Sequence, residues 1–399
     1  MRSTCACSPR ATSLTTCGSS STRSSGVSEP LSTHGAPLRE YTLLAIESSC
    51  DETAAAVVRS GAEGGALVLS DVVRSQVAFH AKWGGVVPEI ASRNHLVDIT
   101  PVVEEAVARA GVSWAGIDAV AVTQGPGLVG ALLVGLQVAK SLAYAHRKPL
   151  IPVHHLLGHL SAVALYAPDE PPPALPPFPH LALIVSGGHT ALYRVEGPEE
   201  ARPVANTCDD AAGEAFDKVA RMLGLGYPGG PAVEREARLG DPRAHSFTLP
   251  RLKGRPLDLS FSGLKTAVLT VIKARGALPA EQEMRDLVAS FQRAAVAQLV
   301  DRCLAALDAE GLRDLTVAGG VACNTPLREA LAARLAAGGG RLYVPPRRWC
   351  TDNAAMIGAA ALRAAPALVA RGPSRADLSL NALSSWPLGA PHPARAAQP

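Results

Sequence analysis

The sequence has few aromatic residues and no long uninterrupted apolar run. Phe, Trp and Tyr together make up 4% of the 399 residues, so rows of aromatic side chains on which single-stranded nucleic acids stack cannot be common. The most apolar stretch, residues 125–139, contains Pro126 and Gln137 and is shorter than the ~18 residues that a membrane span needs. We therefore expect an aliphatic core and no membrane-spanning segment.

Cysteine pairs at the spacing of a metal or redox motif are also lacking. No Cys-x-x-Cys occurs, which argues against a zinc ribbon and a thioredoxin-type site. The net charge of +3 permits an anionic partner without requiring one. We expect incidental thiols in a reducing compartment, at Cys5, Cys7, Cys17, Cys50, Cys208, Cys303, Cys323 and Cys350.

Both ends of the chain differ from its middle. Residues 1–40 are rich in Ser, Thr and Arg, with no acid before Glu29, and we predict a disordered extension. This extension is either an organelle transit peptide or the product of a misassigned start codon. Residues 366–399 are predicted to be an Ala/Pro-rich tail. Residues 167–179 hold seven prolines and are predicted to form a surface connection.

Between these ends, predicted strands and helices alternate, which indicates an α/β fold. Residues 43–58 and 181–195 share one layout, an apolar strand, a small polar turn and a second apolar strand. Duplicated halves of this kind resemble the actin-like ATPase architecture. Strands are expected at 43–46, 54–58, 118–123, 181–185, 191–195, 315–318 and 341–344, and helices at 129–145, 281–310 and 353–362.

Two glycine turns follow predicted strands, at Ser186-Gly187-Gly188 and at Gly319-Gly320. Glycine lets backbone N–H groups approach an anion closely, and turns at the carboxyl ends of strands are where α/β folds bind nucleotides. Neither turn matches the P-loop or the dinucleotide fingerprint. A phosphate site and a purely structural turn both stay open at this point.

Two histidines, His155 and His159, lie four residues apart. On a helix this spacing places both imidazoles on one face, within reach of one metal ion. A zinc protease needs Glu directly after the first histidine, but Leu156 stands there. The best candidate for a third ligand is Asp352, which could equally be the N-cap of the helix that comes after it.

Acidic residues offer further candidates. Asp51 and Glu52 follow the first strand directly; such a pair is usually a turn or a cap, but near a phosphate loop it could hold a base or a metal-bound water. Asp217 lies on an amphipathic helix, where a solvated charge is the default.

Nine motifs in order resemble the TsaD family, the tRNA N6-adenosine threonylcarbamoyltransferases. The resemblance runs over residues 42–364. The motifs are AIESSCDET (45–53), SQVAFHAKWGGVVPEIASRNH (75–95), VTQGPGLVGALLVG (122–135), VHHLLGH (153–159), IVSGGHT (184–190), GEAFDKVARMLGLGYPGGP (213–231), SFSGLKTAV (260–268), AGGVACN (318–324) and CTDNAAMIG (350–358).

The resemblance implies a two-lobed actin-like ATPase (ASKHA) fold with duplicated domains. It implies transfer of the threonylcarbamoyl group from threonylcarbamoyl-AMP to N6 of adenosine 37 in tRNAs that read ANN codons, with release of AMP. By position, the implied metal ligands are His155, His159 and Asp352, for iron (Fe²⁺) or zinc. The implied catalytic acids are Asp51 and Glu52. The implied substrate-binding residues are Ile184, Val185, Ser186, Gly187, Gly188, Asp217, Gly230 and Asn324.

The resemblance also suggests an organisation and partners. We expect a first lobe over 41–150, a second lobe with the metal and nucleotide site over 151–350, and a helix over 351–365 that packs back toward the first lobe. Bacterial relatives in the cytoplasm usually work with TsaB-like and TsaE-like helper proteins, whereas mitochondrial relatives act as homodimers. The first alternative makes this chain cytoplasmic, and a transit peptide at 1–40 would make it mitochondrial.

Other expectations concern a departure from the family, the tRNA contacts and rival functions. Many bacterial members have Glu where this chain has Leu157, which could alter the surroundings of the metal. tRNA phosphates are expected to contact Arg251, Lys253, Arg255, Arg347 or Arg348, which could equally be solvated loop charges. Three rival functions are a metalloprotease, an old label of the family, an ATPase or sugar kinase of the same fold, and a non-enzymatic scaffold in a modification complex, against which the intact candidate ligands argue.

Overall fold

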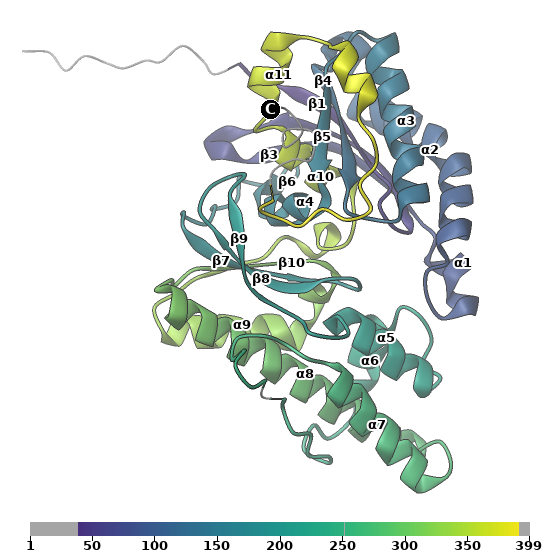
Figure 1. Cartoon of the computed structure of the whole chain (residues 1–399), viewed down its shortest axis with the longest axis vertical. Helices are drawn as coiled ribbons and strands as arrows, with labels where there is room; N and C mark the ends of the chain where they lie inside the picture. The colour runs from purple at the N-terminus through teal and green to yellow at the C-terminus, as the bar shows by residue number, and fades with distance from the viewer. Residues whose placement is uncertain (1–38, 251, 391–399) are drawn as a thin grey trace, which may run out of the picture. The chain divides into compact units, whose positions relative to one another are not determined.

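The computed structural model describes residues 39–250 and 252–390 (Figure 1). The described residues from Glu40 onward belong to one compact unit. Apart from its last two residues, the extension predicted for 1–40 lies outside the described residues. Among the described residues, no single helix is long and apolar enough to cross a membrane, and one bent helix pair, Ala354–Ala361 with Ala365–Arg371, passes the test by length and composition only.

The first sheet has six strands in the order β5-β4-β1-β2-β3-β6. β1, β2 and β3 pair antiparallel, while β4, β5 and β6 join parallel to their neighbours. Because β5 pairs with β4, the boundary predicted at residue 150 falls inside a strand, and the chain leaves this sheet only after β6. The strands β1 to β6 span Thr42–Glu47, Glu52–Ser60, Ala66–Ser75, Ala119–Gly125, Leu150–His154 and Leu165–Tyr166.

Helices cover both faces of the first sheet. α2 buries Ile99, Val102, Val103 and Ala106, a helical spacing that places all four on one face. They pack with α3 against one side of the sheet, and α10 packs on the other side. These helices and their short neighbours span Val77–His80 (α1), Pro88–Ala110 (α2), Val129–Ala145 (α3), Ala354–Ala361 (α10) and Ala365–Arg371 (α11).

The second sheet repeats the order of five strands of the first, β5-β4-β1-β2-β3, and within the described residues it has no counterpart of β6. Its order is β11-β10-β7-β8-β9, again with three antiparallel strands followed by parallel ones. This equivalence confirms the duplicated α/β fold. The strands span His180–Val185 (β7), Thr190–Val195 (β8), Ala201–Asn206 (β9), Leu315–Ala318 (β10) and Leu342–Tyr343 (β11).

Five helices pack on the outer face of the second sheet and share one large apolar core with it. They span Ala212–Met222 (α5), Gly229–Ala237 (α6), Ser262–Arg275 (α7), Glu281–Glu310 (α8) and Thr325–Ala337 (α9). Short 3₁₀ helices complete the described chain, at Ala62–Gly64, Ala81–Trp83, Trp114–Gly116, Ala162–Ala164, Gly320–Cys323, Arg347–Trp349 and Arg375–Ser379, labelled η1 to η7.

Two short helices lie between the sheets, in equivalent places of the two halves. α4, His155–Ser161, follows β5, and α10 follows β11. Leu156 and Leu160 of α4 pack on the inner face of the second sheet. Gly158 lets α4 approach α10 closely, since a Cβ there would lie 2.7 Å from Ile357 Cδ1. α4 and α10 therefore lie side by side (Figure 1).

The end of the described chain differs from the tail predicted for 366–399. Residues 365–379 form α11 and η7, and residues 380–390, called the C-terminal strap below, run past β4 toward α4 and the second sheet (Figure 1). Leu388 is buried in the apolar cluster of α4 and the second sheet. The sequence of the strap has no helical or strand periodicity, so it does not predict that these residues pack against the rest of the protein.

Candidate metal and substrate site

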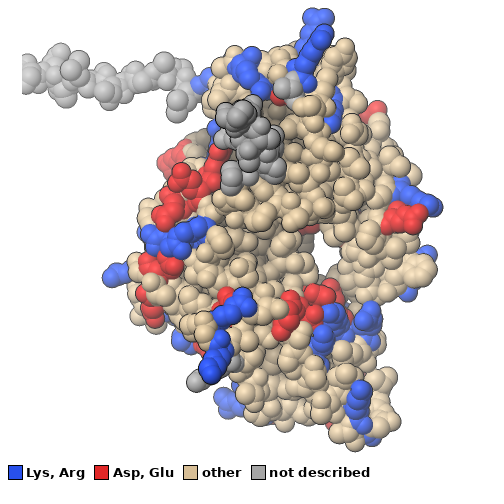
Figure 2. Space-filling view, viewed as in Figure 1, with Lys and Arg blue, Asp and Glu red and all other residues tan. Residues whose placement is uncertain are grey.

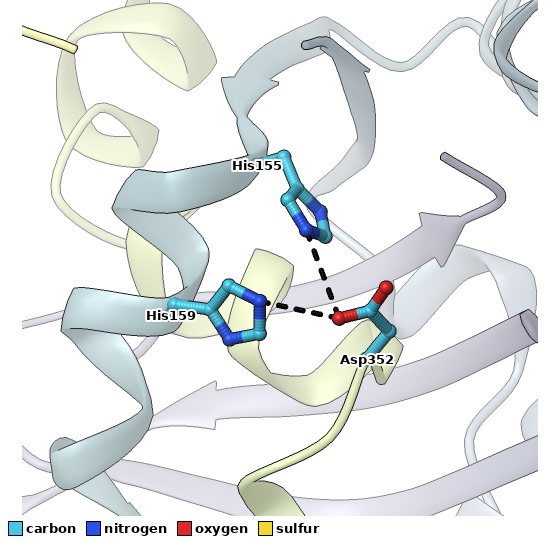
Figure 3. Close-up of side chains that lie close together, drawn as sticks. All are labelled: His155, His159 and Asp352. Atoms are coloured by element: carbon cyan, nitrogen blue, oxygen red, sulfur yellow. Dashed lines mark ion pairs between the residues drawn. The ribbon is translucent and has the colours of Figure 1, made fainter. Parts of the chain in front are cut away.

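Three side chains from α4 and the segment before α10 form a potential metal-binding group. Their candidate ligand atoms all lie within 4.8 Å of one another. Asp352 Oδ1 lies 3.1 Å from His159 Nε2 and 3.7 Å from His155 Nε2 (Figure 3). The structure thus brings together the three ligands that the sequence suggested.

The alternative role of Asp352 as a helix cap is wrong. The N-cap of α10 is Asn353, whose Oδ1 accepts a hydrogen bond from Met356 N at 2.9 Å. Because Asn353 takes this role, the carboxylate of Asp352 is free to face the two histidines.

The surroundings of His159 fit a bound cation. The ring is 1% exposed. Within the described part of the chain neither of its nitrogens makes a hydrogen bond of good geometry, although Nε2 lies 3.1 Å from Asp352 Oδ1. A buried polar atom without a partner is costly, and coordination by a nitrogen lone pair would satisfy it. Two imidazoles and one carboxylate with open positions suit Fe²⁺ or Zn²⁺.

A buried carboxylate that the sequence analysis missed orients His155. Glu47 ends β1, is fully buried, and its Oε2 lies 3.1 Å from His155 Nδ1. The same oxygen accepts a hydrogen bond of 2.6 Å from Thr123 Oγ1. Since Nδ1 is held by Glu47, His155 presents Nε2 to the group, the arrangement in which carboxylates typically orient metal-binding histidines.

The titration of these groups follows from their mutual attraction. Burial would raise the pKa of Glu47, but the charge and hydrogen bond of His155 outweigh burial and lower it. Burial would lower the pKa of His155, but Asp352 and Glu47 raise it to about 9. A site that holds a proton so firmly also favours a metal cation in its place.

The two acids after β1 lie beside this group. Burial raises the pKa of Glu52 well above its ordinary range, and the charges of Asp352 and Asp51 raise it further. Burial, followed by the charges of Asp51 and Asp217, raises the pKa of Tyr227. Asp51 of the first half therefore shares its surroundings with Asp217 and Tyr227 of the second.

The glycine turn between β7 and β8 presents its backbone and not its flanking side chains. Ile184 and Val185 are 0% exposed, so only their main chain could contact a substrate. Gly187 and Gly188 are exposed, with open space where a Cβ would stand. Ser186 closes the turn by accepting a hydrogen bond from His189 N.

His189 connects this turn to the metal-binding group. Burial lowers its pKa to about 4, and the nearby positive charges of His155 and His159 act in the same direction. His189 belongs to the IVSGGHT motif, but nothing in the local sequence assigns it a role. Only folding brings His189 within electrostatic reach of His155 and His159, so no local pattern could have identified it.

Of the remaining predicted substrate residues, Asp217 and Asn324 have structural partners, whereas Gly230 is open. Asp217 on α5 accepts a hydrogen bond of 2.7 Å from Gly229 N, so it is not the solvated charge taken as the default. Asn324 caps α9 through Leu327 N, while its Nδ2 donates to Gln292 Oε1 at 2.9 Å. Gly230 lies in the first turn of α6 with open space around it.

The predicted tRNA contacts have different surroundings. Arg251 lies outside the described residues. Arg255 pairs with Asp258, Arg347 donates to Thr325, and Arg348 pairs with Glu170. Figure 2 shows a hollow between the part formed by α1 and the second half, with charges of both signs near it and wide uncharged areas. No broad basic patch covers the described residues on this face.

Leu157, the position at which a departure from the family is expected, is half-buried and packs against the apolar clusters on both sides of α4. Its side chain contributes apolar contacts and does not supply a charge to the group formed by His155, His159 and Asp352.

Comparison with known proteins gives one consistent family. Residues 67–359 match the family described as TsaD, tRNA N6-adenosine threonylcarbamoyltransferase. A protein of that name from Trichlorobacter lovleyi is 55% identical over 349 residues, 87% of this chain and 96% of the relative. Another, from Anaeromyxobacter dehalogenans (strain 2CP-C), is 54% identical over 347 residues, 87% of this chain and 99% of the relative.

A solved structure with a similar fold is HypF of T. kodakarensis. It superimposes with a TM-score of 0.54 at 13% identity, and covers 86% of this chain and 49% of that protein. At this identity the likeness concerns the fold alone.

Proposed function

The chain belongs to the TsaD family of tRNA N6-adenosine threonylcarbamoyltransferases, and from this premise we propose that it transfers the threonylcarbamoyl group from threonylcarbamoyl-AMP to N6 of adenosine 37 in tRNAs that read ANN codons. One observation carries the proposal: Ile184, at the end of β7 before the exposed glycine turn, packs in the same apolar cluster as Leu156 of α4, the helix that carries His155 and His159. A nucleotide held at the turn would have its acyl end near the group formed by these histidines and Asp352.

The glycine turn holds the AMP portion in this proposal. The backbone at Gly187 and Gly188 has open space around it, so its N–H groups can approach a phosphate without a side chain in the way. Asp217 and Gly230 at the neighbouring helices would contact the nucleoside portion.

The acids after β1 act on the adenine. N6 attacks the carbonyl carbon of the mixed anhydride, a C–N bond forms, the C–O bond to the phosphate breaks, and AMP leaves with the electron pair. Asp51 or Glu52 accepts the proton that N6 releases. Since adenine N6 is a poor nucleophile, holding it beside the activated carbonyl supplies much of the acceleration.

His155, His159 and Asp352 would hold one divalent ion, and we propose Fe²⁺, with zinc as the second choice, because two histidines and one carboxylate suit both. When bound, such an ion polarises a carbonyl or phosphoryl oxygen. Glu47 keeps His155 in the tautomer that presents Nε2.

The rival functions have less support. A zinc protease needs a carboxylate at position 156, where Leu156 is buried against the second sheet. An ATPase or sugar kinase would not need the histidine pair. TsaB-like and TsaE-like helpers, or a second copy of the chain in a homodimer, are the proposed protein partners, and the cytoplasm is the proposed compartment.

The test is mass spectrometry of tRNA nucleosides after deletion of the gene and its restoration as wild type or as Asp352→Ala. We expect threonylcarbamoyladenosine to disappear on deletion, to return with wild type, and to stay absent with Asp352→Ala. Persistence of the nucleoside in a deletion strain without a paralogue would exclude the proposed activity. Its return with Asp352→Ala would exclude the proposed metal site.

A further inference from the structure

We propose that the C-terminal strap is a positioning element of the metal centre: it holds the first turn of α4, and with it His155, through the side chain of His154. This role rests on the proposed metal site. It makes the position of His155 depend on residues that lie outside the matched family region 67–359.

The strap is first anchored at the end of β4. Gln124 Nε2 donates to Asn381 O at 2.8 Å, and Leu383 N donates to Gln124 O at 2.9 Å. Gly125 is needed beside this contact, because a Cβ there would lie 2.1 Å from Leu383 O. Two hydrogen bonds and a close backbone approach define where the strap begins its crossing toward α4.

The strap then binds the residue that caps α4. His154 Nδ1 accepts the backbone N–H of Leu156 at 3.1 Å and so caps the helix. Because Nδ1 accepts, Nε2 carries the proton and donates it to Trp386 O at 2.9 Å. The two rings of His154 and Trp386 lie 4.6 Å apart. One imidazole therefore joins the strap to the start of the helix, one residue before His155.

A third anchor lies on the apolar face of α4. Leu388 is 7% exposed and belongs to the same apolar cluster as Leu156 and Leu160. The face of α4 formed by Leu156 and Leu160, next to the face that carries His155 and His159, is thus packed in part by the strap. Holding both the cap and the buried face leaves little freedom for the helix that carries two of the three ligands.

The physical consequence is preorganisation of the ligands. Nδ1 of His155 faces Glu47, and Nε2 faces Asp352 and the place that a metal ion would take. A shift of the first turn of α4 would move both contacts at once. Groups that orient metal ligands typically change metal affinity by 10–100-fold when they are removed.

The experiment measures Zn²⁺ affinity of the full-length protein by competition with a chromophoric chelator. His154→Asn should keep the cap, since Asn is a good N-cap residue, but its shorter side chain cannot reach Trp386 O. We expect Zn²⁺ affinity to fall about tenfold, and kcat of transfer to fall more than KM for tRNA changes. Leu388→Ala, which weakens the strap at its other anchor, should lower Zn²⁺ affinity in the same direction.

The double variant distinguishes positioning from general loosening. If His154 acts through the strap, Leu388→Ala should have a smaller effect in the His154→Asn background than in wild type. Leu307→Ala, at a 4% exposed position of α8 in the core of the second half, is the matched control and should leave Zn²⁺ affinity unchanged.

Each alternative outcome has a separate meaning. Wild-type Zn²⁺ affinity in His154→Asn, or an equal loss in Leu307→Ala, would overturn the role of the strap and leave the proposed function intact. Absence of Zn²⁺ binding or of transferase activity in the wild type would overturn the proposed metal site or function instead.

Discussion

Replacing Glu47 by Gln should weaken metal binding without unfolding the protein. The amide keeps the size of the carboxylate, and its oxygen can still accept the hydrogen bond from Ser49 N. Its NH₂ group then takes the place of Oε2, where the Thr123 hydroxyl, which now donates, can accept instead. Toward His155 Nδ1, which lies 3.1 Å from Glu47 Oε2, it can present an N–H group. The ring would then carry its proton on Nε2, the nitrogen that faces Asp352, and that tautomer cannot bind a metal through Nε2.

The expected loss of affinity is about 10–100-fold, which corresponds to about 1.4–2.7 kcal/mol of binding free energy. Folding should be affected little, because a neutral amide is less costly to bury than a carboxylate. The assay is Fe²⁺ or Zn²⁺ titration against a competing chelator, with the melting temperature of the metal-free protein measured alongside.

Two variants make this result interpretable. Glu47→Asp keeps the charge on a shorter side chain and should bind more weakly than wild type but more tightly than Glu47→Gln. Glu234→Gln removes another buried carboxylate, one that accepts hydrogen bonds from Asn324 and Thr325, and should leave metal affinity unchanged. If Glu47→Gln binds metal within twofold of wild type, Glu47 does not orient His155.

Three further predictions concern other parts of the molecule. Gly187→Ala, with open space for the new Cβ, should leave the melting temperature unchanged but raise KM for threonylcarbamoyl-AMP. Gly263→Ala, equally unobstructed, is the control and should change neither. An unchanged KM in Gly187→Ala would show that the glycine turn does not bind this substrate. Glu52→Gln should lower kcat while tRNA binding persists. Because burial raises the pKa of Glu52, kcat of the wild type should rise with pH as this acid ionises. If Glu52→Gln keeps the wild-type kcat, Glu52 is not the base and Asp51 takes that role. Burial raises the pKa of Asp71 to about 6 from 3.8, so its stabilising contribution is full below about pH 4 and is lost as pH rises through 6. Asp71→Asn should therefore raise the free energy of unfolding above pH 6 by at most about 3 kcal/mol and leave it unchanged at pH 4, both measured by chemical denaturation. An equal increase at both pH values would show that ionisation of Asp71 is not the cause.

Local patterns were sufficient for most of the fold. The alternation of apolar strands, turns and amphipathic helices predicted the strands at 181–185 and 315–318 and the helices at 129–145 and 281–310, and all four occur. The similar layouts of 43–58 and 181–195 predicted the duplication, which the shared order of five strands confirms. These features depend on neighbours in the chain, so the sequence records them directly.

Predictions failed where packing between distant segments decided the outcome. The boundary at 150 fell inside β5 because the pairing of β5 with β4 is not encoded within β5. The C-terminal strap has no periodicity, yet Gln124 and His154 hold it with hydrogen bonds. No local pattern reports such contacts, because each depends on a residue more than two hundred positions away.

The candidate site shows the same division. The spacing of His155 and His159 is a property of one helix, and it was enough to predict that both imidazoles share a face. Their meeting with Asp352, the buried contact with Glu47 and the nearness of His189 arise only when β1, α4, the glycine turn and the start of α10 pack together. The sequence therefore predicted the three candidate metal ligands. The distances between these side chains and their protonation states depend on burial and on charges that only folding brings close.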